Sequence, residues 1–135
     1  MIKVTILSVG KTKEEWLEEA LAEYEKRLSR DVKIEWIIVK DDRQLQDKIG
    51  PGAFCLDPQG KSFSSESFAT FVAEQGSRMM FVIGGPAGLP PSLKLTHPLL
   101  CLSSLTFTHQ ITRLVLAEQI YRAFTILSGK PYHKA

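Results

Sequence analysis

Two residues at the start of the last apolar helical pattern could carry chemistry, and they lie one helical turn apart. His109 and Arg113 have the i, i+4 spacing that places both side chains on one face of a helix. An imidazole can take or give a proton near neutral pH, and a guanidinium can bind a phosphate or a carboxylate. Each residue also has a structural alternative. His109 could hydrogen-bond a loop carbonyl at the helix start, and Arg113 could form an ion pair with Glu118 or Glu25.

A second group of reactive side chains lies in the C-terminal tail, where Tyr132 and His133 are adjacent. The sequence has no Ser-His-Asp order, no HExxH motif and no Walker-type lysine that would assign these histidines to a known hydrolase or nucleotide site. Cys55 and Cys101 each lie inside an apolar run, without CxxC or Cys/His spacing. We therefore expect two buried thiols and no metal site.

Residues 81–89 change abruptly from strand formers to three glycines and a proline. The carboxyl end of a buried strand is where α/β proteins place ligands, and glycine allows close backbone approach. The GGxxG spacing differs from the GxGxxG of dinucleotide-binding folds, and Pro86 removes one N–H from the loop. Two interpretations of this segment therefore remain: a ligand-binding loop, or a plain strand-to-helix turn without a ligand. Asp57 stands at another strand end, where the sequence Asp-Pro-Gln-Gly favours a turn over a ligand contact.

Strand and helix patterns alternate along the chain. The predicted strands are 2–9, 32–39, 53–56, 79–83 and 99–102, and the predicted helices begin at a Thr12–Glu15 capping box, occupy 40–49, begin at Ser64 or Ser65, and cover 90–95 and 109–127. This order predicts an α/β fold with a mainly parallel sheet and helices on both faces. The last helix is apolar over more than one stripe, so we expect a second copy of the chain to pack against it.

Composition and length say little more about the domain number, the partners or the location of the protein. The 135 residues fit one domain, 1–135, and 44% hydrophobic with 24% charged residues is ordinary for a globular protein. A net charge of +2 is compatible with nucleic-acid binding without arguing for it. We find no pattern of a signal peptide or of a membrane span, so we expect a cytoplasmic protein without membrane contact.

Particular residues match one known family nearly end to end, in order and in spacing. They are 6–11, 24–28, 56–61, 81–85, 88–89, 102–103, 105–107, 109–110, 113, 116, 118–123 and 132–134. In these segments the chain resembles the RlmH family, SPOUT-class methyltransferases that modify a pseudouridine of 23S ribosomal RNA. The family usually has proline before the histidine of the last helix. This chain has Thr108, which can cap the helix itself.

The resemblance implies a deep trefoil knot in the C-terminal part, a homodimer, and S-adenosylmethionine held by the knot loops, with no metal. Carried over by position, the cofactor contacts would be Leu56, Gly84, Leu102, Ser103, Ser104, Leu105, Thr106 and Phe107. Backbone groups of these loops could read the adenine edge, and the apolar side chains could form the walls. We expect Gly84 and Gly88 to leave room for the methionine moiety.

The reaction implied by the resemblance is methyl transfer to N3 of a pseudouridine in 23S ribosomal RNA, within the ribosome or its large subunit. N3 must lose its proton, so a positioned base would help. We expect His109 and Arg113 near the cofactor, with Tyr132 and His133 contributed by the partner subunit. We expect RNA phosphates to be met by basic residues such as Lys11, Lys130 and Lys134.

Two other functions remain open from the sequence. One is an α/β dimer that binds a nucleotide or RNA without catalysis. The other is a SPOUT methyltransferase with a different RNA target. Binding of S-adenosylmethionine would separate the first from the enzyme, because a specific ligand raises the melting temperature by mass action.

Overall fold

A computed structural model describes residues 1–10 and 14–135, and its helices and strands alternate along the chain. The strands are β1 Ile2–Val9, β2 Val32–Val39, β3 Phe54–Ser62, β4 Arg78–Ile83 and β5 Leu99–Cys101. The helices are α1 Glu15–Leu28, α2 Asp42–Lys48, α3 Ser65–Glu74, α4 Pro91–Thr96 and α5 His109–Leu127.

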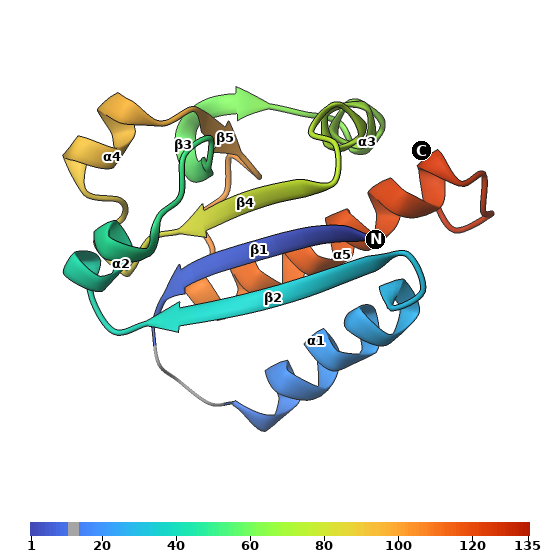
Figure 1. The fold of residues 1–135 in the computed structure, drawn as a ribbon, viewed down its shortest axis with the longest axis horizontal. Helices are drawn as coiled ribbons and strands as arrows, with labels where there is room; N and C mark the ends of the chain where they lie inside the picture. Colours follow the sequence, from blue (N-terminus) through green and yellow to red (C-terminus); the bar gives the residue numbers. More distant parts are fainter. Residues whose placement is uncertain (11–13) are drawn as a thin grey trace.

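The five strands form one parallel sheet in the order β2-β1-β4-β3-β5. Figure 1 shows β1, β2 and β4 running in the same direction, with α5 crossing one face of the sheet. Because β1, β2 and β4 are parallel, their carboxyl ends meet at one edge, and the loop that follows β4 lies there. This edge carries the glycine loop.

Helices cover both faces of the sheet, as the sequence predicted. Alternate residues of β1 separate the two sides: Val4 and Ile6 belong to a core that includes α3 and α5 residues, whereas Leu7 and Val9 belong to a core that includes residues of α2 and α4. A smaller cluster around Leu17 fastens α1 onto α5. Helix α5 is therefore held by the sheet, α3 and α1.

Short polar side chains begin three of the helices. Thr108 accepts a hydrogen bond from the Ile111 N–H and caps α5, and Asp41 caps α2 in the same way. Ser64 forms a reciprocal capping box with Ser67 at the start of α3, which confirms one of the two predicted caps.

Helix α1 begins at Glu15, with Glu14 in the N-cap position and without a side-chain cap. The predicted cap residue Thr12 lies outside the described residues, so the Thr12–Glu15 capping box stays a prediction.

Strand β3 differs from the prediction that it ends at residue 56. It continues to Ser62 through a register shift, in which Leu56 and Lys61 both pair with Leu100 of β5. The intervening Asp-Pro-Gln-Gly segment therefore bulges out of the strand without ending it. The carboxylate of Asp57 accepts the Gln59 N–H at 2.9 Å, which confirms its turn-forming role.

Both cysteines are buried and free, as predicted. Burial raises the pKa of the Cys55 thiol to about 11, with a smaller contribution from the Asp57 carboxylate. No helix within residues 1–10 and 14–135 is long and apolar enough to cross a membrane.

Candidate active site

The candidate cofactor residues come from three neighbouring strands and the loops that follow two of them. Leu56 lies within β3 before its bulge, Gly84 follows β4, and Leu102 follows β5. Leu56 and Leu102 are half-buried and pack against the same core on the α3 and α5 face. That these residues bind a cofactor stays a prediction.

The glycine loop after β4 folds into a tight turn. The Gly88 N–H donates to the Gly85 carbonyl at 2.9 Å, and Gly88 has a φ of +85°, which favours glycine. A Cβ on Gly84 would lie 2.8 Å from the Gly88 carbonyl carbon, so the backbone of the loop occupies that space. The space where a Gly84 side chain would lie is therefore taken by the loop itself, and a role of Gly84 in cofactor binding stays a prediction. A Cβ on Gly88 would meet no atom within 4 Å, so open space exists at that glycine.

The loop between β5 and α5 is shaped by its own polar groups. The Ser103 hydroxyl accepts the Leu105 N–H at 3.0 Å, and the Cys101 thiol donates to the Ser103 carbonyl. Ser104 and Thr106 are exposed, Phe107 is half-buried, and 70% of Leu105 is exposed. The loop therefore presents apolar side chains and backbone groups at the strand-end edge.

Two cavities differ in their relation to these loops. A cavity of about 160 Å³ is lined by Cys101 and Leu102 together with residues of α3 and α5. That volume is below the roughly 300–1,000 Å³ of small-molecule sites, so this cavity by itself is too small for a full cofactor. A larger cavity of about 440 Å³ lies at the opposite edge, beside Ile2 and Val32 at the amino ends of β1 and β2. None of the candidate cofactor residues lines it.

Arg113 is buried, and its guanidinium holds the carboxyl end of β1. Its Nε donates to the Ser8 hydroxyl at 2.9 Å, and its Nη2 donates to the carbonyls of Val9 at 3.2 Å and Gly10 at 2.6 Å. Burial lowers the pKa of the guanidinium, and the Glu14 carboxylate opposes this shift. These contacts differ from the ion pairs that the sequence allowed. They assign Arg113 to holding the strand end.

His109 begins α5 and lies directly against Gly10. A Cβ on Gly10 would lie 2.6 Å from His109 Nε2, and Gly10 has a φ of +117°, so both contact and conformation require glycine. Nε2 is buried and has no hydrogen-bond partner among the described residues. Burial lowers the pKa of His109 and the Arg113 charge lowers it further, while Glu14 acts in the opposite direction. The environment thus favours a neutral imidazole with one open hydrogen-bonding position.

Tyr132 folds back onto α5. Its hydroxyl donates to Glu118 at 2.8 Å, and its ring packs edge-on against Tyr121 with centroids 4.6 Å apart. Burial, followed by the Glu118 contact, raises the pKa of Tyr132 to about 12. The phenol therefore stays protonated at neutral pH and acts as a hydrogen-bond donor.

His133 lies between α3 and α5. Its Nε2 is 2.8 Å from Glu66 on α3, and its Nδ1 is 3.0 Å from Nη1 of Arg122 on α5. Arg122 also pairs with Glu118 at 3.0 Å and lies 4.8 Å from the centroid of the Tyr132 ring. The tail is therefore bound to two helices.

The four predicted catalytic residues form two separate pairs. His109 and Arg113 lie in the first two turns of α5, whereas Tyr132 and His133 bind Glu118 and Arg122, in the middle and second half of the helix. Arg113 and Arg122 are nine residues apart, about 13 Å along the helix, so the two pairs are held at separate places on α5.

Sequence reasoning did not nominate Glu66, Glu118 or Arg122 as site residues. The i, i+4 spacing of Glu118 and Arg122 indicated a helical ion pair, and the structure contains it. The Glu66 contact with His133 spans 67 positions and leaves no local pattern.

Comparison with known proteins agrees with the fold. A family model described as "Predicted SPOUT methyltransferase" matches residues 2–133. The chain belongs to the SPOUT methyltransferases and, within that class, to the RlmH family.

Two relatives carry the name ribosomal RNA large subunit methyltransferase H. The protein from Protochlamydia amoebophila is 53% identical over 140 residues, covering 99% of this chain and 100% of the relative. The protein from Desulforamulus reducens is 41% identical over 160 residues, covering 99% and 100%. A solved structure of a probable methylase family protein from Haemophilus influenzae has a TM-score of 0.59 at 10% identity, covering 99% of this chain and 70% of that one. This last likeness concerns the fold alone.

Proposed function

We propose that this chain, as one domain of residues 1–135, transfers a methyl group from S-adenosylmethionine to N3 of a pseudouridine in 23S ribosomal RNA. The observation that carries the proposal is the 53% identity over nearly the whole chain to a ribosomal RNA large subunit methyltransferase H. Family membership supports the use of S-adenosylmethionine as the methyl donor. The arrangement of the strand-end loops supports the placement of the site.

In this proposal, S-adenosylmethionine binds where the ends of β3, β4 and β5 meet and supplies an electrophilic methyl group. Leu56, Leu105 and Phe107 provide apolar walls, while Gly84 and residues 102–107 provide backbone hydrogen-bonding groups. The open space at Gly88 and the exposed Leu105 fit this role.

We further propose that two copies of the chain complete the site. Trp16 on α1 is 50% exposed and Ile111 on α5 is 37% exposed, on two helices that pack together. Apolar side chains on adjoining helices suit a two-fold interface. A dimer allows Tyr132 and His133 of one chain to approach the cofactor loops of the other, which would unite the two catalytic pairs.

The proposed roles of the four residues follow from their contacts. Arg113 holds the end of β1 next to His109 and acts as a positioning residue. His109 offers a buried Nε2 without a partner among the described residues, which could accept a hydrogen bond. Tyr132 can donate through its hydroxyl, and His133 can take the proton that N3 loses.

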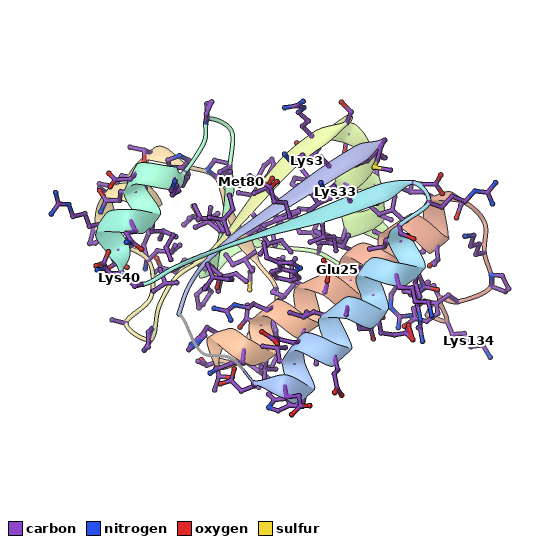
Figure 2. The ribbon with its side chains drawn as sticks, turned by 60° about the horizontal axis from the view of Figure 1, so that its bottom comes forward. Lys3, Glu25, Lys33, Lys40, Met80 and Lys134 are labelled. Atoms are coloured by element: carbon purple, nitrogen blue, oxygen red, sulfur yellow. The ribbon has the colours of Figure 1, made fainter. Side chains whose placement is uncertain are left out.

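The C-terminal trefoil knot of the family is part of the same proposal. Gly60 supports a tightly wound segment, because a Cβ there would meet the backbone of Leu99 and Leu100. RNA phosphates would be met by exposed lysines. Lys130 and Lys134 are exposed, and Figure 2 shows Lys134 at the outer edge of the molecule. Lys11 lies outside the described residues and stays a prediction.

Incorporation of labelled methyl groups tests the proposal. Purified protein, labelled S-adenosylmethionine and ribosomes that lack the modification should yield labelled 23S RNA. Cofactor binding without label on these ribosomes would favour a SPOUT methyltransferase with another RNA target. Absence of both cofactor binding and label would favour the alternative of a non-catalytic RNA- or nucleotide-binding dimer.

A further inference from the structure

His133 is held between two side chains from different helices. Its Nε2 is 2.8 Å from a carboxylate oxygen of Glu66, near the start of α3, and its Nδ1 is 3.0 Å from Nη1 of Arg122. In Figure 1 the C-terminus lies beside α3, which places the tail next to Glu66. The imidazole is thus clamped by one acceptor and one donor.

These two partners determine which ring nitrogen carries the proton. A guanidinium can only donate hydrogen bonds, so Nδ1 of His133 accepts from Arg122. The proton of the neutral ring is then on Nε2, which donates it to the Glu66 carboxylate. The hydrogen bond from His133 is the largest cause of the lowered pKa of Glu66. Glu66 therefore stays ionised and continues to accept.

Arg122 is itself hydrogen-bonded to a second carboxylate, that of Glu118. Its Nη2 and Nε donate to the two carboxylate oxygens of Glu118 at 3.0 Å and 3.4 Å. Glu118 also accepts the Tyr132 hydroxyl at 2.8 Å. The tail residues and the two helices form one connected polar network around His133.

The network continues to the cavity beside the β5–α5 loop. Gln119 donates to Glu118 at 2.8 Å and accepts from the Ser65 hydroxyl at 2.8 Å. Gln119 and Ser65 both line the 160 Å³ cavity together with Leu102. His133 is therefore connected through hydrogen bonds to this cavity of its own chain.

We propose that Glu66 is a positioning residue for His133. The inference rests on the proposed function and adds to it the tautomer of the base and the atom that accepts the proton. Arg122 and Glu66 together keep the proton on Nε2, so Nδ1 is the basic position of the ring. In the proposed step N3 of the pseudouridine would replace Arg122 as the partner of Nδ1 and give it the N3 proton, while the electron pair left on N3 would take the methyl group and the donor would leave as the neutral thioether. The resulting imidazolium stays bonded through Nε2 to Glu66, whose charge stabilises it.

Three variants test the role of Glu66. Glu66→Ala removes the acceptor, Glu66→Gln keeps an acceptor oxygen without the charge, and Glu74→Ala is the matched control. Glu74 ends the same helix and is exposed. The loss of Glu66 should leave folding intact because its side chain is 53% exposed.

The first readout is independent of activity. Nitrogen-15 NMR of the imidazoles should show His133 as the Nε2-protonated tautomer in the wild type and in Glu74→Ala. Glu66→Ala should remove the hydrogen bond at Nε2 and move its nitrogen-15 shift, whereas Nδ1 keeps the hydrogen bond from Arg122. An unchanged Nε2 shift of His133 in Glu66→Ala would overturn the proposal.

The second readout is methyl transfer to ribosomes. Glu66→Ala should lower kcat by at least about tenfold with an unchanged KM for ribosomes, and Glu66→Gln should recover part of the loss. An unchanged kcat in Glu66→Ala would overturn the catalytic part. If the wild type transfers no methyl group, the proposed function fails, while the nitrogen-15 measurement still decides whether Glu66 orients His133.

Discussion

Arg113 Nε lies 2.9 Å from the Ser8 hydroxyl, and this hydrogen bond joins residues that are 105 positions apart. It fastens the start of α5 to the carboxyl end of β1. The same guanidinium binds the carbonyls of Val9 and Gly10. The first strand and the last helix are therefore locked together at the edge of the sheet where His109 lies.

Substituting Arg113 should destabilise the protein. Arg113→Lys keeps the charge but cannot reproduce the Nε and Nη2 contacts, so the buried Ser8 hydroxyl and strand-end carbonyls lose a donor. We expect a loss of about 3 kcal/mol in the free energy of unfolding. Urea denaturation at fixed protein concentration measures it. Arg78→Lys, at an exposed position of β4, is the control. Equal stability of the two variants would refute the anchoring role.

Two glycines of the same loop should respond differently to alanine. At Gly84 the new methyl group would meet backbone atoms at 2.8 Å to 3.0 Å, so we expect a loss of about 3 kcal/mol or more. At Gly88 the methyl group meets open space, and only the positive φ is strained, which costs about 1–2 kcal/mol. Thermal and urea unfolding of both variants compare them. A larger loss at Gly88 would contradict the described turn.

His109 should make stability depend on pH near neutrality. Its pKa in the folded protein is lowered from 6.5, mainly by burial. Between that lowered value and 6.5 the unfolded chain binds more protons, so stability rises with pH across this window. The stabilisation is present above pH 6.5 and is lost as pH falls through the folded pKa.

Replacing His109 by glutamine should remove this slope. Unfolding free energies of the wild type and His109→Gln are to be measured from pH 8 to pH 5, with His97→Gln as a matched loss of one imidazole. We expect the difference between the wild type and His109→Gln to change across the window. Parallel curves would show that the environment of His109 does not favour the neutral ring.

Local patterns predicted much of the fold. The bounds of α5 followed from its apolar stripes and the capping Thr108, and the first two strands followed from β-branched runs. The predicted β3 was too short because a Pro-Gly pattern is compatible with both a turn and a bulge. Only the pairing of β3 with β5 decides between the two.

The candidate site was less predictable because its contacts are long-range. The spacing of His109 and Arg113 placed them on one face of a helix, but it did not indicate that Arg113 would bind the end of β1. The contact between Glu66 and His133 has no local pattern either. The cofactor loops and the knot were expected from the resemblance to the family alone, because periodicity does not encode them, whereas the dimer was also expected from the apolar pattern of α5.

The most direct test of the proposed function is the identity of the methylated nucleoside. Ribosomes that lack the modification are incubated with the protein and labelled S-adenosylmethionine, and the 23S RNA is digested for mass spectrometry. We predict label in 3-methylpseudouridine, absent without the protein. Label in another nucleoside would contradict the proposed substrate, and no label despite cofactor binding would contradict methylation of this RNA.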